Sequence, residues 1–507
     1  AALAWQGATR EHPGRIRPRS NAAQVGWLAG RCLIHNPGKP LDMDSRPSAR
    51  PLVWEHLTGD ETHISALVSA LGIDPVIAHL LVLRGIAAPD KAERFLHPSI
   101  DHLHDPFQLA DLPLAVDRLL RAIDRKERIA VHGDYDVDGV TSTVILRRLL
   151  ELLGADVVHF IPDRIKDGYG LEPAGIERLA AQQVSVVVSV DCGIRSGAAA
   201  TRARELGLDL VITDHHEPDA TLPPALAVIN PKRPDCPYPD KDLAGVGVAL
   251  KLVQALCQRT DHTRWLPGFL KMAALGTVAD VVPLRGENRV IAKLGLDQLS
   301  RGPHTTGLRA LLDSTGLLGQ TLTSFHIAFR LAPRINAAGR MSTPDLAARL
   351  LLLADEGRTA EAKDLAEQLD TENLRRQQEE ADILTAARRR VDTDPDVGAH
   401  AMLVVWGEGW HRGVIGIVAA KLVDAFHRPA IVLAIDGDLA YGSGRSIPGF
   451  DLLDALEHCG DLFTRFGGHR HAAGLTIETG RLKALRTRLT AFADDRLGPD
   501  DLTPRLR

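Results

Sequence analysis

Four side chains that can bind a cation fall within seven residues of the segment "VHGDYDVDGVTST" at positions 131–143. They are His132, Asp134, Asp136 and Asp138. Carboxylates this close repel one another, and either a cation or the N-terminus of a helix offsets the repulsion. The spacing therefore indicates a charged site that needs one of these two partners.

Two familiar motifs explain this segment less well. Asp134-x-Asp136-x-Asp138-Gly begins like an EF-hand loop, but Ile145 stands at the twelfth position, where that loop needs a bidentate Glu. The residues before it also read as a strand, whereas an EF-hand needs a helix. An aspartyl phosphatase also has Asp-x-Asp after a strand, with the first Asp as nucleophile. It would not need the ligands found further along, and its Lys cannot be placed.

Further imidazoles and carboxylates follow later segments of the chain. "VDCG" supplies Asp191, "TDHHEP" supplies Asp214, His215 and His216, and "GTVADVVPL" supplies Asp280. In open parallel sheets ligands bind beyond the carboxyl ends of strands, so clusters that follow strands should converge on one edge. Imidazole and carboxylate without thiolate suit Mn²⁺ or Mg²⁺, and this many acids suits two metals.

The elements that would position these ligands are those of an α/β protein. Short, nearly continuous apolar strands alternate with helices, which predicts a parallel sheet covered on both faces. A long polar helix, from about residue 359 to 391, then leads to a smaller α/β domain. The strands are expected at 128–133, 155–162, 184–190, 206–213 and 225–230, and in the second domain at 401–407, 429–435 and 472–478.

This reading divides the chain into six segments. Residues 1–50 have no periodicity and are expected to be a disordered or spurious extension, and residues 51–125 are mostly helical. The catalytic domain is expected at 126–355, the connecting helix at 356–392, the second domain at 393–495 and a tail at 496–507.

Composition limits the class of protein and its compartment. The formal net charge of 507 residues is −5, so any site for a polyanion must be local rather than spread over the molecule. The five cysteines are scattered without a C-x-x-C pair, which disfavours a disulfide scaffold and suits a reducing cytoplasm. No apolar run has membrane-spanning length. We therefore expect a cytoplasmic protein without a membrane partner.

The motifs together resemble a known superfamily. "VHGDYDVDG", "VDCG", "TDHH" and "GTVADVVPL" resemble the four metal motifs of the DHH phosphoesterases, and "SGRS" and "FGGHRHAAG" resemble their partner domain, DHHA1. "HDPFQLADLPLAVDRL", "GDYDVDG", "FRLAPRINAAGRM" and "GWHRGVIGIVAAKL" further resemble the RecJ family of single-strand-specific exonucleases. The resemblance covers about residues 51–507.

The resemblance implies a parallel-sheet DHH domain joined by the long helix to a DHHA1 domain, with two divalent cations, Mn²⁺ or Mg²⁺, as cofactors. His132 and Asp136 would hold one cation, Asp138, His215 and Asp280 would hold the other, and Asp191 would bridge them. His216 would face the scissile phosphate, so His216 and Asp191 are the implied catalytic residues. Asp134 is a further candidate ligand, and Asp214 is expected to orient His215 from behind.

The resemblance also implies residues that contact the substrate. Arginine suits bidentate contact with phosphate, and glycines let a phosphate approach backbone N–H groups. Taken alone, the glycines fit a tight turn and close helix packing. The implied substrate-binding residues are Arg334, Asn336, Arg340, Ser443, Arg445, Ser446, Gly467, Gly468 and His469.

The implied function is a single-stranded-DNA-specific 5′–3′ exonuclease that releases 5′-mononucleotides in DNA recombination and repair. Single-stranded DNA threaded between the two domains is the expected partner, and a helicase and a single-strand-binding protein are candidate partners. A DHH phosphodiesterase for short oligonucleotides or cyclic dinucleotides is an alternative. A non-catalytic RecJ-like scaffold is another, disfavoured because every metal ligand is kept.

One feature departs from the family pattern. RecJ proteins usually continue into an OB-fold, which grips single strands, but this sequence stops at "LTPRLR", about where that domain would begin. Either the sequence is truncated or this form lacks the domain. Absence of the OB-fold would concern affinity and processivity and leave the catalytic residues unaffected.

Overall fold

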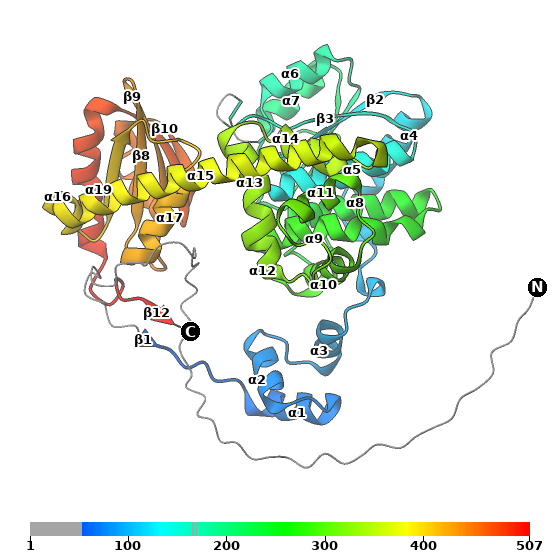
Figure 1. The fold of residues 1–507 in the computed structure, drawn as a ribbon, viewed down its shortest axis with the longest axis horizontal. Coiled ribbons are helices and arrows are strands. Elements are labelled where there is room, and N and C mark those ends of the chain that lie inside the picture. Colours follow the sequence, from blue (N-terminus) through cyan, green and yellow to red (C-terminus); the bar gives the residue numbers. More distant parts are fainter. Residues whose placement is uncertain (1–52, 165–166, 169, 507) are drawn as a thin grey trace, which may run out of the picture. The chain divides into compact units, whose positions relative to one another are not determined.

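Five parallel strands form the sheet on which the predicted metal ligands are arranged (Figure 1). The computed structural model describes residues 53–164, 167–168 and 170–506, so the expectation for residues 1–50 lies outside the described residues. The strand order is β3-β2-β4-β5-β6, which reverses between β2 and β4 and creates a switch point there. The strands are β2 (Arg128–His132), β3 (Asp156–Phe160), β4 (Val186–Val190), β5 (Asp209–Thr213) and β6 (Ala227–Ile229).

Helices cover both faces of this sheet, as the continuous apolar strands predict. Ile129 and Val131 of β2 belong to the core that packs against α5, α8 and α9, whereas Ala130 belongs to the core under α6 and α7. Alternate residues of one strand therefore bury against different helical layers. The helices are α5 (Val137–Leu152), α6 (Pro173–Ala181), α7 (Gly197–Glu205), α8 (Gly245–Arg259) and α9 (Leu270–Ala279).

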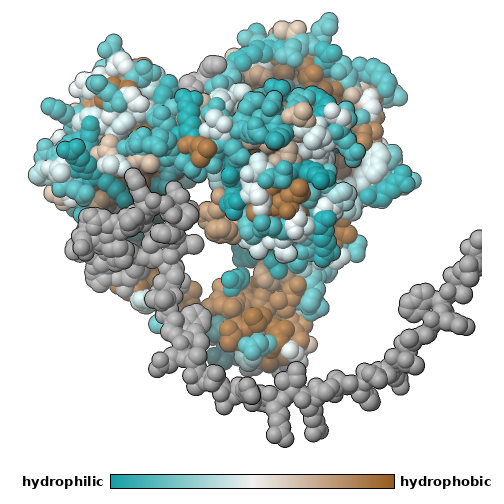
Figure 2. All heavy atoms as spheres, viewed as in Figure 1, coloured by the Kyte–Doolittle hydropathy of each residue, from teal (hydrophilic) through white to brown (hydrophobic). Residues whose placement is uncertain are grey.

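The N-terminal part is helical, with one strand that the sequence pattern does not predict. Helices α1 (Glu61–Leu71), α2 (Pro75–Leu83) and α3 (Pro89–Leu96) share a small core, and α4 (Leu112–Asp124) packs on the main core. Hydrophobic side chains gather on the surface over this region (Figure 2). Strand β1 (Val53–Trp54) pairs in parallel with β12 (Arg505–Leu506), so the predicted tail contributes a strand.

Between the sheet and the long helix lies a group of helices. They are α10 (Gly286–Arg301), α11 (Thr306–Ser314), α12 (Ser324–His326), a π-helical turn η4 (Ile327–Leu331), α13 (Ala332–Met341) and α14 (Asp345–Leu352). The predicted long polar helix is confirmed as α15 (Thr359–Thr393). No described helix is long and apolar enough to span a bilayer.

The second domain is a five-stranded sheet in the order β10-β11-β9-β8-β7. Its elements are β7 (Leu403–Glu408), α17 (Ile415–Phe426), β8 (Ala430–Asp436), β9 (Leu439–Arg445), α18 (Leu452–Glu457), β10 (Phe463–His469), β11 (Ala472–Glu478) and α19 (Leu482–Arg496). Strands β9 and β10 are not predicted, because their glycines interrupt the strand pattern. At Gly442 of β9 a Cβ would lie 2.8 Å from the Leu475 side chain, so close packing explains this glycine.

Candidate metal centre

The switch point of the parallel sheet places His132 and Asp191 on neighbouring strands. His132 ends β2, and Asp191 directly follows β4 with a left-handed backbone φ of 60°. A non-glycine residue in this conformation costs free energy and is often found where a side chain must be aimed at a functional site. A Cβ on Gly245 of α8 would lie 2.2 Å from Asp191 Oδ1, so only glycine allows this approach.

Helix N-termini hold the carboxylates of the first motif. Asp136 is the N-cap of α5 and accepts a hydrogen bond from Gly139 N at 3.0 Å. Asp138 accepts hydrogen bonds from Gly245 N at 2.7 Å and Val246 N at 2.8 Å, at the start of α8. Helix ends therefore offset part of the repulsion among these acids. The negative charge that the helix ends leave uncompensated attracts cations.

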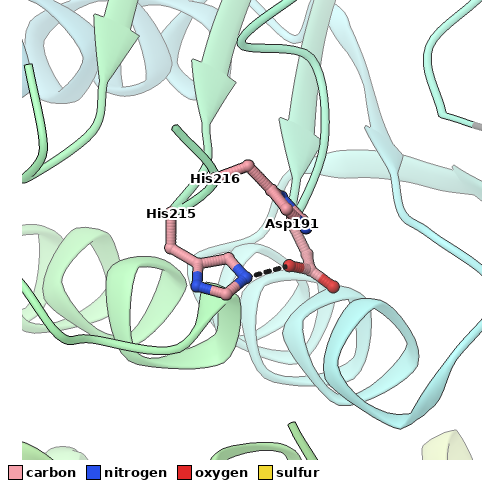
Figure 3. A group of neighbouring side chains, drawn as sticks. All are labelled: Asp191, His215 and His216. Carbon is pink, nitrogen blue, oxygen red and sulfur yellow. Dashed lines mark ion pairs between the residues drawn. The ribbon is translucent and has the colours of Figure 1, made fainter. Parts of the chain in front are cut away.

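His215 and Asp280 complete a convergent group around Asp191. His215 Nε2 lies 3.2 Å from Asp191 Oδ1 (Figure 3). The same nitrogen lies 3.7 Å from Asp280 Oδ2 and 3.9 Å from Asp138 Oδ2. Asp280 follows the last residue of α9, and Gly276 lets that helix approach α5, because a Cβ there would lie 2.8 Å from Asp138 Oδ1. Ligands from three strand ends and two helices thus meet at one place.

Three overlapping sets have ligand atoms within 4.8 Å of one another. Asp191 belongs to two of them, and its role as a bridge between two cations stays a prediction. His132 belongs to none of these sets. Its Nδ1 lies 3.8 Å from Cys192 Sγ, and its role as a ligand beside Asp136 stays a prediction. The sets are Asp134, Asp136 and Asp191; Asp138, His215 and Asp280; and Asp191, His215 and His216.

Burial and like charges shift the titration of the carboxylates at this centre. Burial, reinforced by Asp136, raises the pKa of Asp134 to about 8 and that of Asp280 to about 7. Burial and neighbouring carboxylates also raise the pKa values of Asp138 and Asp191. Without a cation these acids hold protons that ordinary carboxylates would lose.

The unpaired atoms of the site suit a divalent cation. Burial lowers the pKa of His132 to about 4 and that of His215 to about 3, so both rings are neutral at pH 7 and can offer a lone pair. Among the described residues, the buried atoms His132 Nε2, Asp191 Oδ1 and His215 Nε2 have no hydrogen-bond partner. Buried polar atoms are normally paired. Asp191 Oδ1 and His215 Nε2 lie among other carboxylates, and such oxygen and nitrogen lone pairs are the donor set of Mn²⁺ or Mg²⁺.

Asp214 holds His216, which corrects the expectation that it orients the ring of His215. Its Oδ1 lies 2.7 Å from His216 Nδ1 and accepts hydrogen bonds from the backbone N–H groups of both histidines. Burial opposes the shift, but the hydrogen bond and charge of Asp214 raise the pKa of His216 to about 9. Because Asp214 and His216 are only two residues apart, the short Asp side chain can form a local hydrogen bond with the His216 ring. His216 is therefore a cation at neutral pH.

The substrate-binding residues predicted on α13 separate into two groups. Asn336 Oδ1 accepts a hydrogen bond from Val137 N at 3.1 Å, and Arg340 Nη1 donates to Gly413 O at 3.1 Å. Arg334 instead pairs with Asp370 of α15, so its predicted substrate contact stays a prediction that would require this ion pair to be shared or broken. Residues four apart share a helix face, whereas residues two apart point about 200° from each other.

The predicted substrate-binding residues at the end of β9 also make hydrogen bonds that hold the local structure. Arg445 Nη1 donates to Ser443 Oγ at 3.2 Å and to Gly444 O at 2.7 Å. Ser446 Oγ donates to Phe450 O at 2.8 Å, which fixes the turn after the strand. Burial and Arg164 lower the pKa of Arg445. Arg445 thus carries its charge into a region that already holds another cation.

The glycines of "GGHRHAAG" lie in an antiparallel hairpin. Gly467 pairs with Gly474 and Gly468 with Ala473, so the alternative of a tight turn at these glycines is wrong. Gly467 and Gly468 line a pocket together with Tyr135 of the first motif. His469, at the end of β10, has a pKa that burial lowers, with further lowering by cations that include Arg445 and His216. This hairpin therefore faces the metal centre.

Sequence reasoning missed Arg164 and Tyr135. The guanidinium of Arg164 lies 5.1 Å from the centre of the Tyr135 ring. Burial lowers the pKa of Arg340 to about 10, and the charge of Arg164 lowers it further. Arg164, Arg340 and Arg445 form a cluster of positive charge beside the acidic centre. Arg164 belongs to no recognisable motif. Its position just beyond the carboxyl end of β3, where ligands of parallel sheets bind, could have marked it as a candidate.

Fold and site define this chain as a DHH-type protein with a DHHA1 domain. Residues 128–277 match the DHH family, N-terminal domain, and residues 398–495 match the DHHA1 domain. The chain belongs to the RecJ family. It is 37% identical over 450 residues to the single-stranded-DNA-specific exonuclease RecJ of Escherichia coli K12, which covers 84% of this chain and 76% of that protein.

Further relatives agree with this placement. The RecJ of Bacillus subtilis is 42% identical over 460 residues, covering 90% of this chain. This chain spans 57% of the length of that relative. Among solved structures, RecJ of Thermus thermophilus in complex with Mn²⁺ has a TM-score of 0.77 at 34% identity, covering 90% of this chain and 64% of that one. An exonuclease RecJ bound to manganese has a TM-score of 0.69 at 37% identity, covering 80% and 98%.

Proposed function

We propose that this chain is a single-stranded-DNA-specific exonuclease that hydrolyses phosphodiester bonds with two divalent cations, Mn²⁺ or Mg²⁺. The observation that carries the proposal is the overlap of ligand sets at Asp191, which is buried and whose Oδ1 lies 3.2 Å from His215 Nε2. Asp134, Asp136 and Asp191 would hold one cation, and Asp138, His215 and Asp280 would hold the other. Because its Oδ1 lies this close to His215, Asp191 would be shared between the two cations. Bound cations supply an activated water and neutralise charge on the phosphate.

The protein's own groups bind the phosphate and move a proton. His216 is held through Nδ1 by Asp214, so its Nε2–H is available to donate to a phosphate oxygen or to the leaving group. Arg340 and Arg445 supply positive charge for the phosphates of the strand. The relatives named above support single-stranded DNA as the substrate. Release of 5′-mononucleotides from the 5′ end, action in recombination and repair in the cytoplasm, and cooperation with a helicase and a single-strand-binding protein are parts of the same proposal.

The test uses single-stranded DNA of about 50 nucleotides, several times the site size of one single-strand-binding domain. We expect immediate release of mononucleotide from a 5′ label in Mn²⁺, delayed release from a 3′ label, and no release in EDTA. A duplex of the same sequence should stay intact. Cleavage of dinucleotides with intact long strands would instead favour the small-substrate phosphodiesterase. Binding without any cleavage would favour the scaffold.

Arg340 and Arg334 form a matched pair of variants. Removing a charge-assisted contact costs about 1.5–3 kcal/mol, so Arg340→Ala should raise KM for single-stranded DNA by roughly tenfold or more. Arg334→Ala should leave KM unchanged and lower the melting temperature, because this side chain joins α13 to Asp370 of α15. Steady-state kinetics and thermal melting separate the two effects. Equal KM values for both variants would show that Arg340 does not contact the substrate.

Asp214→Asn should change the pH profile of the reaction. Burial lowers the pKa of His216, and in the unaltered chain the carboxylate of Asp214 outweighs this effect. Without the carboxylate the pKa should fall, and the ring should lose its proton at neutral pH. We expect the alkaline fall in kcat to begin below pH 9 and the activity at pH 7.5 to drop by roughly 10–100-fold, the usual effect of losing an orienting partner. Asp219→Asn, a more exposed acid in the same loop, is the control. An unchanged alkaline limb would exclude His216 as the proton donor.

A further inference from the structure

A largely apolar pocket of about 400 Å³ lies between helices of the first domain, and none of its lining residues is a candidate metal ligand. Its wall is built by residues of α5, the short helix η3 (Thr263–Phe269), α9 and α14. The volume is within the range of small-molecule sites. Met272 lies eight residues before Asp280 on α9, or roughly 12 Å along the helix axis. Lining side chains include Val144, Leu152, Trp265, Met272, Leu351 and Leu352.

Three cations and no carboxylate line this pocket. They are Arg148, Arg264 and Lys271. Arg264 makes no hydrogen bond or ion pair with any other described residue, and Lys271 donates only to a backbone oxygen, that of Pro303. Arg148 has a weak partner at 3.5 Å in Glu151. The rim therefore carries positive charge that the protein does not neutralise.

A buried hydroxyl at the same pocket also lacks a partner. Thr305 precedes α11 as its N-cap, where a Thr side chain usually accepts a hydrogen bond from the helix. Here it makes no capping bond, and its buried Oγ1 has no hydrogen-bond partner among the described residues. Buried polar atoms without a partner are rare in native structures. A polar atom of a ligand in the pocket would supply the missing bond.

We propose that this pocket binds a small amphipathic anion, which is an aromatic ring or short aliphatic chain that carries one carboxylate, sulfonate or phosphate. The apolar walls remove the ring or chain from water, which is the main source of affinity. Arg264 and Lys271 meet the anionic group, and the Thr305 hydroxyl contributes a hydrogen bond. A simple packing defect would explain the volume but not the unneutralised cations around it. The site is independent of the proposed nuclease activity.

The test follows the fluorescence of 1-anilinonaphthalene-8-sulfonate, an aromatic anion, with the full chain. We expect saturable binding of one equivalent, and displacement by octanoate. Gly268→Leu should weaken binding by tenfold or more, since each tenfold is about 1.4 kcal/mol and a leucine side chain would occupy the pocket. A Cβ at Gly268 meets no atom within 4 Å, so the fold has room for it. Arg264→Glu should weaken binding to a similar extent by reversing a charge at the rim.

Matched variants separate this pocket from other apolar surface. Gly197→Leu adds the same side chain at another glycine whose Cβ would meet nothing within 4 Å, and Arg94→Glu reverses a charge on α3. Both should bind the dye as the unaltered chain does, and thermal melting without dye reports whether each variant is folded. Binding that is absent in the unaltered chain, or equal in Gly268→Leu, Arg264→Glu and the controls, would overturn the proposal. Arg264→Glu decides the matter if Gly268→Leu does not fold.

Discussion

Asp191→Asn should abolish hydrolysis of single-stranded DNA while leaving the protein folded. The carboxylate lies in two of the three ligand sets, so its loss weakens the binding of both cations. Losing one electrostatic contact to a transition state costs about 10²–10³-fold in rate, and we expect at least that loss here. The measurement is the rate of mononucleotide release in Mn²⁺, with cation binding followed by calorimetry.

The same variant should be more stable than the unaltered chain when no cation is present. Burial and neighbouring carboxylates raise the pKa of Asp191, so keeping this acid in the folded state costs free energy at pH 8. The neutral amide of Asn removes that cost. A higher melting temperature in EDTA together with lost activity would exclude misfolding as the cause. Such a trade of stability for function is common at active sites.

Asp156→Asn is the matched control for Asp191→Asn. Asp156 begins β3 in the same sheet, and its exposed ion pair with Arg128 spans 2.9 Å. Such a pair contributes about 0–1 kcal/mol, so neither activity nor melting temperature should change much. If Asp191→Asn keeps activity within about tenfold of the unaltered chain, a loss below that of one transition-state contact, the shared-ligand assignment is wrong.

Most of the first domain could be predicted from the sequence, because one physical rule connects the hydrophobic pattern of a strand with its position in the sheet. Strands buried on both faces read as continuous apolar runs, and their carboxyl ends share one edge of the sheet. That rule alone brings Asp191 and the histidines after β5 to the segment after β2. The glycine-rich strands β9 and β10 escaped prediction because glycine has no side chain to show a strand period.

Details of individual side chains depend on contacts that no local pattern reveals. Arg334 and Arg340 look equivalent in "APRINAAGR". Only their positions on α13 determine that Arg334 pairs with Asp370 of α15, whereas Arg340 donates to Gly413 O. Asp214 is followed directly by two histidines, and the sequence does not show which ring its carboxylate holds. In the structure it holds the ring of His216. Arg164 could not be found by motif, since its contact with Tyr135 joins two different strand ends.

Cation binding should stabilise the protein more at pH 8 than at pH 6. In the cation-free folded protein, burial raises the pKa of Asp134 to about 8 and that of Asp280 to about 7, above the ordinary value of about 3.9. The folded state then binds more protons than the unfolded state between about pH 4 and 8. By linkage, the stability of the cation-free protein falls as the pH rises through this window.

Bound cations reverse this trend because they require ionised carboxylates. Each proton released on binding changes the affinity about tenfold per pH unit, or about 1.4 kcal/mol, in favour of binding at higher pH. The gain in melting temperature on adding Mg²⁺ should therefore grow from pH 6 to pH 8. Calorimetry in two buffers with different heats of ionisation counts the protons directly.

Asp134→Asn tests which carboxylate releases the protons. The variant should release fewer protons on binding Mg²⁺ and show a shallower pH dependence, because one acid with a raised pKa is gone. Asp156→Asn should keep the full dependence, since its exposed carboxylate is remote from every ligand set. A gain in melting temperature that is constant with pH would mean that the acids are already ionised without cations. In that case helix N-termini, such as the start of α8 at Asp138, would offset the repulsion without cations.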